Sequence, residues 1–140
     1  MMSNICDLLL SDAFTIYLAF SGILLSLITL LYSFIIGKRS ELELCAEASK
    51  FGQNNPLMKK KQSNLIRQIK NISKINKKVF IVLLLSLKAC VISWVSIRFV
   101  SDNYYVSSLC LIGFLTLLIA IIMIKMVWEL YLQYKNDIKL

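Results

Sequence analysis

Histidine is absent from this chain of 140 residues, and the chain contains only one proline and four glycines. Without histidine, no histidine-based proton relay, catalytic triad or metal site is possible. The scarcity of proline and glycine argues against a sandwich or barrel, because many short strands need many turns. The four cysteines lack the CxxC spacing typical of zinc or redox sites. No glycine-rich phosphate loop, nucleophile motif or pair of catalytic acids is present either, so we expect neither an enzyme nor a bound cofactor.

Charge is also scarce, because only 17% of the residues are charged whereas 58% are hydrophobic. A soluble domain is usually about half apolar and about a quarter charged. The net charge is nevertheless +8, from 16 basic and 8 acidic residues. A small chain that is both very apolar and strongly basic is expected to separate these properties into membrane segments and a basic region.

Three apolar runs occur at 13–36, 79–100 and 106–124, and the only charged residues within them are Lys88 and Arg98. A helix needs about 20 residues to cross a ~30 Å hydrocarbon layer, and no run alternates in the manner of a barrel strand. If the runs were buried helices of a soluble protein, almost no amphipathic helix would remain to cover them. The sequence therefore predicts an all-α integral membrane protein. Its three transmembrane helices are named span one (13–36), span two (79–100) and span three (106–127).

The flank that precedes span one, residues 1–12, is expected to lie outside the cell. It carries Asp7 and Asp12 but no Lys or Arg. A cleavable signal peptide begins with a positively charged region instead. Span one is therefore expected to remain in the membrane as an anchor whose N-terminus is external.

The distribution of Lys and Arg predicts the orientation of all three spans. Residues 37–78, named the basic segment, contain eleven basic and three acidic residues and so carry the whole net charge of +8. The flank 1–12 and the turn 101–105 contain no basic residue, whereas Lys135 and Lys139 lie in the C-terminal stretch 128–140. Because Lys and Arg concentrate on the cytoplasmic side, we expect the N-terminus outside and the C-terminus inside, in a bacterial cytoplasmic membrane.

The basic segment is predicted to form a cytoplasmic helical hairpin whose arms prolong spans one and two. In the first arm, Leu44, Ala48 and Phe51 follow helical spacing. Gly52 suits a helix end, and the turn at 54–56 ends with the proline that suits the next helix start.

Two further features bear on the arms of this hairpin. Ser40 followed by Glu43 resembles a capping box, although span one could instead run on through Gly37. The second arm is expected to continue into span two without a break. Its apolar face has helical spacing and consists of Leu65, Ile69, Ile72 and Val79, with Asn76 between them.

The positive charges of the basic segment are interpreted as a topology determinant that also attracts anionic lipid headgroups. Docking of an acidic protein is the alternative. Nucleic acid is not expected as a partner, because Phe51 is the only aromatic residue available for stacking among the basic residues. The candidate docking residues are Lys59, Lys60, Lys61, Arg67, Lys70, Lys74, Lys77 and Lys78.

Rows of small or hydroxylated residues run along the spans with steps of three and four residues. Such rows let helices approach closely in lipid, and a strict heptad repeat implies a left-handed crossing. The rows either pack the three helices of one subunit or form a seam between subunits, where hydroxyls could line a narrow aqueous path. Serine and threonine hydroxyls can also bond the carbonyl one turn earlier in their own helix. The candidate residues are Thr15, Ala19, Gly22, Ser26, Thr29 and Ser33 in span one, Ser86 and Ser93 in span two, and Gly113 and Thr116 in span three.

Lys88 is expected near the middle of the bilayer, where a lysine costs roughly 2.5–3.5 kcal/mol. No Asp or Glu occurs inside any span, so the spans offer it no carboxylate partner. Three interpretations remain open: the side chain snorkels toward the cytoplasm or is neutral, it faces a polar cavity or hydroxyls in an oligomer, or it pairs with an acidic residue of another protein.

The three-span arrangement is similar in topology to that of some phage holins, although the basic segment is longer than the short loops expected there. The first functional hypothesis is a non-enzymatic inner-membrane protein that self-associates as a channel-like or membrane-perturbing effector in phage lysis or phage defence. The second is a membrane-resident binding protein, such as an immunity protein against a pore-forming toxin or a small accessory subunit of a larger membrane complex.

Overall fold

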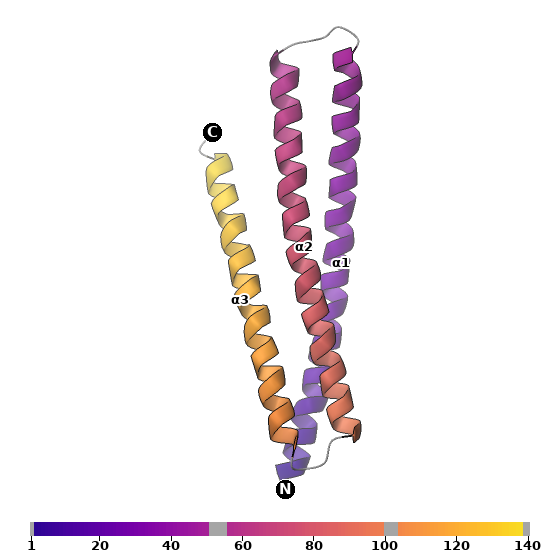
Figure 1. Cartoon of the computed structure of the whole chain (residues 1–140), viewed down its shortest axis with the longest axis vertical. Coiled ribbons are helices and arrows are strands. Elements are labelled where there is room, and N and C mark those ends of the chain that lie inside the picture. Colours follow the sequence, from indigo (N-terminus) through magenta and orange to yellow (C-terminus); the bar gives the residue numbers. More distant parts are fainter. Residues whose placement is uncertain (1, 51–55, 100–103, 139–140) are drawn as a thin grey trace. The chain divides into compact units, whose positions relative to one another are not determined.

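The computed structural model describes residues 2–50, 56–99 and 104–138, and within these ranges it contains helices and no strand (Figure 1). Helix α1 covers Met2–Lys50, α2 covers Pro56–Phe99 and α3 covers Tyr105–Ile138. Each helix includes a stretch that is long and apolar enough to cross a membrane. The predicted all-α class, with three helices that could span a membrane, is therefore confirmed, and it points to a membrane location.

All three helices are longer than a bilayer requires. They contain 49, 44 and 34 residues. At 1.5 Å per residue these helices are roughly 70, 65 and 50 Å long, whereas the hydrocarbon layer is ~30 Å thick. Each helix therefore has turns to spare beyond the length that a crossing needs.

Helix α1 runs without interruption through Gly37 and Ser40. The capping box expected at Ser40 and Glu43 is thus wrong, and the alternative, that the helix of span one continues, is correct. A glycine inside a helix is less favourable than alanine by about 1 kcal/mol, which the strong helix formers that follow it can offset. The helix end expected at Gly52 and residues 54–55 of the expected turn lie outside the described residues. Pro56 is the first residue of α2, a position that suits its fixed backbone angle.

The contacts divide the chain into two units, and α1 and α2 contribute to both. The first unit, named the three-helix unit, combines the chain up to Leu25 with the chain from Phe80 onward. The second, named the two-helix unit, is Ser26–Val79.

The three-helix unit packs α1 and α2 together through side chains in a heptad repeat. Helix α2 buries a row of mostly small residues, and α1 buries a row that includes larger ones. Steps of three, four and seven residues keep such rows on one face of each helix, the pattern of left-handed helix packing. The buried residues are Val82, Ser86, Ala89, Ser93 and Ser96 in α2, and Leu10, Tyr17, Ser21 and Leu24 in α1.

Helix α3 buries a line of residues spaced seven apart in this unit: Tyr105, Ile112, Ile119 and Met126. The most apolar window of α2 is 39% buried within the structure, whereas those of α1 and α3 are each 11% buried. Helix α2 is therefore the best covered helix. Most of the apolar surface of α1 and α3 is left for lipid or for another protein.

The two-helix unit has a thin core, as the sparse apolar pattern of its sequence indicates. Cys45, Leu65 and Val79 are buried, and most of the other seam residues are only half-buried. The predicted face of the second arm is confirmed, because Leu65 and Val79 are buried and Ile69 is half-buried. The predicted face of the first arm is wrong, since Leu44 is 66% exposed.

The error in the first arm follows from the continuity of α1. Because the helix does not restart at Ser40, the heptad row that includes Leu24 in the three-helix unit continues unchanged to Leu42 and Cys45. That phase turns Cys45 inward and Leu44 outward. Ala48 is half-buried, and Phe51 lies outside the described residues.

The buried small row of α2 predicts a strong effect of overpacking. Ala89 is fully buried, so Ala89→Leu is expected to destabilise the protein by about 1–3 kcal/mol, because the added atoms would push α1 away. Ala120 of α3 is exposed, so Ala120→Leu is the matched control and should have little effect. Unfolding in mixed micelles, followed by tryptophan fluorescence, measures both. Equal stability of the two variants would contradict this packing.

Candidate functional site

Tyr17 of α1 contacts both other helices of the three-helix unit. Its backbone carbonyl lies 3.2 Å from the hydroxyl of Ser86 in α2, and its phenol is hydrogen-bonded to the hydroxyl of Thr116 in α3. Thr116 donates its own proton to the Ile112 carbonyl at 2.7 Å. Tyr17 is therefore the donor to Thr116, because a hydroxyl has only one proton to give.

Two buried serines complete this junction. The Ser21 hydroxyl lies 2.7 Å from the Tyr17 carbonyl and 2.8 Å from the hydroxyl of Ser86. Both serines are buried, at 6% and 0% exposure. Two hydroxyl protons serve three short contacts, so two of the contacts are hydrogen bonds at any moment. Without water in the lipid interior, such bonds hold helices together at close approach.

The rest of the small row of α2 lacks such partners. The Ser93 hydroxyl is fully buried and has no hydrogen-bond partner among the described residues. Cys90 makes only a weak contact, its sulfur 4.0 Å from the Phe14 carbonyl. The predicted row at Ser86 and Ser93 thus packs helices of one chain together, but only Ser86 bonds across the seam.

The predicted small row of α1, named the α1 stripe, is on a different face from the one that α1 buries. All six residues are exposed in the single chain, and a Cβ added at Gly22 would meet no atom within 4 Å. The hydroxyl of Thr15 donates to the carbonyl of Ser11 in the preceding turn at 3.0 Å. The α1 stripe, which consists of Thr15, Ala19, Gly22, Ser26, Thr29 and Ser33, therefore lies outside the buried face of α1.

The predicted row of α3 has a mixed outcome. Thr116 bonds Tyr17, although its side chain is largely exposed. Gly113 is exposed, with open space where a Cβ would lie. Of the two predicted residues of this row, Thr116 is the one whose side chain contacts another helix of the chain.

Lys88 is exposed on α2 and lies on the helix face away from the buried serines. Its neighbours on that face, Leu84, Val91 and Val95, are 46%, 59% and 39% exposed, whereas Ser86 is fully buried. It forms no ion pair with any residue in the described part of the chain. The single chain therefore presents this ammonium group to its surroundings rather than to its own helices.

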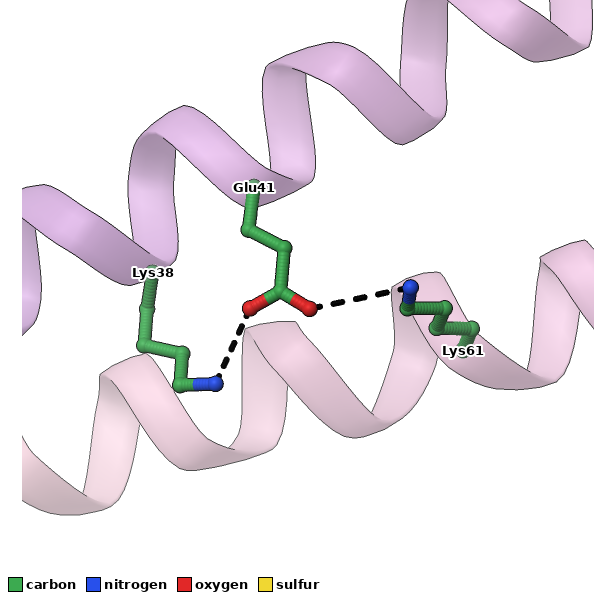
Figure 2. Close-up of polar contacts among 3 residues, drawn as sticks. All are labelled: Lys38, Glu41 and Lys61. Carbon is green, nitrogen blue, oxygen red and sulfur yellow. Dashed lines mark hydrogen bonds and ion pairs between the residues drawn. The ribbon is translucent and has the colours of Figure 1, made fainter.

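In the two-helix unit, Glu41 joins two of the basic residues (Figure 2). The Lys38 amine donates to Glu41 Oε2 at 2.9 Å, and the Lys61 amine, from α2, lies 3.7 Å from Oε1. The hydrogen bond from Lys38 lowers the pKa of the Glu41 carboxyl, desolvation opposes it, and the charges of Lys38 and Lys61 lower it further. The contribution of this pair to stability is present above the ordinary carboxyl pKa and is lost as the pH falls through the lowered pKa. Because these side chains are exposed, that contribution is small.

The predicted docking residues do not form one patch. Lys59 to Lys61 belong to the first turns of α2, near the Gln62 amide that donates to the Cys45 carbonyl at 3.1 Å. Lys70, Lys74 and Lys77 line a separate groove of about 520 Å³ between α1 and α2 in the two-helix unit. Arg67 is exposed and Lys78 is half-buried. The groove is lined by Arg39, Leu42, Ile66, Ile69, Lys70, Ser73, Lys74 and Lys77.

Comparison of the chain with family models, with curated proteins and with solved structures finds no match. Among the residues that the structure describes, no three Cys, Asp or Glu side chains gather closely enough to hold a metal ion.

The sequence did not predict the Tyr17 junction, and Arg39 was only counted among the eleven basic residues of the basic segment. Ser86 was predicted because it is a small residue in a heptad row. Tyr17 was not, because a tyrosine inside a span cannot be told from the other large apolar residues there. One signal was present in the sequence, since Tyr17 and Ser21 are four residues apart and therefore share a helix face.

The junction predicts different effects for two buried serines of α2. Ser86→Ala is expected to destabilise the protein by about 1 kcal/mol, because it removes a hydroxyl bonded to α1. Ser93→Ala is expected to be neutral or stabilising, because its buried hydroxyl has no partner among the described residues. Unfolding in mixed micelles compares the two variants. A larger loss for Ser93→Ala would show that the junction does not hold α1 to α2.

Proposed function

We propose that this chain is a small non-enzymatic inner-membrane protein that self-associates through the α1 stripe and acts as a channel-like or membrane-perturbing effector, of the kind used in phage lysis or phage defence. In this proposal the N-terminus is outside, the C-terminus is inside, and the basic segment is a cytoplasmic hairpin that senses or docks a partner. The bias of eleven basic residues against none supports this orientation.

One observation carries the proposal. Helix α1 has two heptad rows, and the row with Tyr17, Ser21 and Leu24 is the one that is buried in the three-helix unit. The α1 stripe is exposed, although small residues at such spacing are the ones that let two helices approach closely in lipid. A second copy of the chain offers the same stripe, so a symmetric contact between two α1 helices is self-complementary.

Gly22→Leu tests the proposal. The added side chain meets no atom of its own chain within 4 Å at the Cβ, so the single chain should still fold. It would separate two α1 helices packed through the stripe, and we expect association to weaken on the order of tenfold. Light scattering in detergent measures the oligomer, and a membrane-potential dye measures depolarisation in expressing cells.

Ser107→Leu is the control, because Ser107 of α3 is also exposed and is not one of the candidate packing residues. It should leave both association and depolarisation unchanged. A wild-type protein that is strictly monomeric and does not depolarise cells would refute the proposed effector.

The exposure of Lys88 supports a second candidate function, that of a membrane-resident binding protein such as an immunity protein or an accessory subunit. A lysine facing lipid costs roughly 2.5–3.5 kcal/mol, and a carboxylate on a partner helix would offset this. The spans of this chain contain no such carboxylate.

Lys88→Leu is expected to abolish partner binding or protection while membrane insertion improves or stays the same. Lys88→Arg keeps the charge and should retain protection. If a gene for a pore-forming toxin neighbours this one, the measurement is survival of cells exposed to that toxin. Full protection by Lys88→Leu would exclude pairing through this residue, and a neighbouring lysin or nuclease gene would favour the effector instead.

A further inference from the structure

The groove in the two-helix unit brings together cations without a counter-charge. Arg39, Lys70, Lys74 and Lys77 line it, all four are exposed, and none of its lining residues is acidic. None of the four forms an ion pair within the described ranges of the chain. Four like charges around one groove repel each other, so an anionic ligand would relieve them.

Apolar side chains form the rest of the groove. Leu42 of α1 and Ile69 of α2 are half-buried, and Ile66 is 54% exposed. A simple inorganic anion would gain nothing from these three side chains. The lining therefore fits a ligand that has both an anionic and an apolar part.

A second groove in the same unit, of about 340 Å³, serves as an internal comparison. It is lined by Lys38, Lys60 and Lys61, but also by Glu41, which pairs with two of these lysines. Its positive charge is therefore partly neutralised by the chain itself. Of these two grooves, the one at Arg39 leaves its cations to an external partner.

The position of the groove along the helices indicates where its ligand comes from. Within the two-helix unit, α1 and α2 run antiparallel (Figure 1). Gln62 of α2 donates to the Cys45 carbonyl of α1. Counting from this contact, Lys70 is about level with Gly37, and Lys74 is about level with Ser33. These cations thus lie beside the last turns of the apolar run 13–36.

Exposed apolar side chains continue from the groove along α1. Tyr32 and Ile36 are 58% and 51% exposed, and steps of four and three residues put them on the same helix face as Arg39. Cations and exposed apolar groups at one depth match the boundary of a bilayer, where phosphates and acyl chains meet.

We propose that this groove binds an anionic phospholipid of the surrounding bilayer, with the phosphate held by Arg39, Lys70 and Lys74 and an acyl chain along the apolar side chains of α1. This deepens the proposed lipid docking of the basic segment and rests on its position at the membrane surface. It does not depend on self-association. The Lys59 to Lys61 cluster is outside this site.

The test compares two double variants of the full-length protein that each lose two positive charges. Arg39→Gln with Lys74→Gln alters the groove, whereas Lys59→Gln with Lys60→Gln alters the first turns of α2. All four side chains are exposed, and circular dichroism confirms helicity. Binding of phosphatidylglycerol and of phosphatidylcholine to purified protein is measured by native mass spectrometry.

Wild-type protein is expected to retain phosphatidylglycerol in preference to phosphatidylcholine. Each basic residue near an anionic surface corresponds to about a fivefold change in binding, so the groove variant should bind phosphatidylglycerol on the order of tenfold more weakly or worse. The other double variant should stay within about twofold of wild type. Ile66→Gln, which leaves the charge unchanged, should weaken the lipid but not free glycerol phosphate.

Three results would overturn the inference. Equal losses in the two double variants would mean that charge acts over the whole segment rather than in the groove. Equal retention of the two lipids would mean that no anion site exists. Displacement of phosphatidylglycerol by an acidic Leu–Glu helical peptide would assign the groove to a protein partner. In each case an unchanged oligomer and unchanged depolarisation would leave the proposed effector function standing.

Discussion

Close approach of two helix backbones around the Tyr17 carbonyl is the interaction on which the three-helix unit depends. A helix carbonyl already accepts one bond from its own helix, so a second donor must come within about 3 Å of it. Ser86 of α2 does so because serine is short and α2 carries no bulky side chain at Ala89 or Ser93, whereas Ser21 reaches the same carbonyl from the next turn of α1. The small residues of α2 therefore allow the hydrogen bonds between α2 and α1 to form. These bonds in turn fix which residues of the two helices lie opposite each other.

The sequence predicts the class of fold well, because length and apolarity decide which segments can lie in lipid. Length and apolarity alone were enough to predict the three spans. It also predicts the seam of α2 from Leu65 to Val79, since that helix has a clear polar side. The predicted seam of the first arm was wrong at Leu44. That prediction assumed that a new helix begins at residue 40, whereas α1 is continuous there. The residues that face inward in the first arm are therefore determined by the packing of α1 before residue 40.

The candidate site was less predictable. In a span, a row of small residues can face its own chain or another one, and composition is the same in both cases. The small row of α2 is buried, whereas the small row of α1 is exposed. This difference follows from the packing of Tyr17 and Ser21, which lie on the other face of α1. Likewise, a list of lysines does not separate Lys61, which Glu41 partly neutralises, from Lys74, which has no such neighbour in its groove.

The way that α3 is attached has a consequence for how the protein assembles and comes apart. Helices α1 and α2 contact each other in both units, whereas α3 belongs to the three-helix unit alone. There it buries a line of residues from Tyr105 to Met126, and its Thr116 hydroxyl is bonded to Tyr17. During synthesis the first two helices can associate before the third has emerged, and we expect the third to be the first to separate under mild denaturation. The stability of this protein is then graded, with its weakest boundary between α3 and the other two helices rather than at a surface loop.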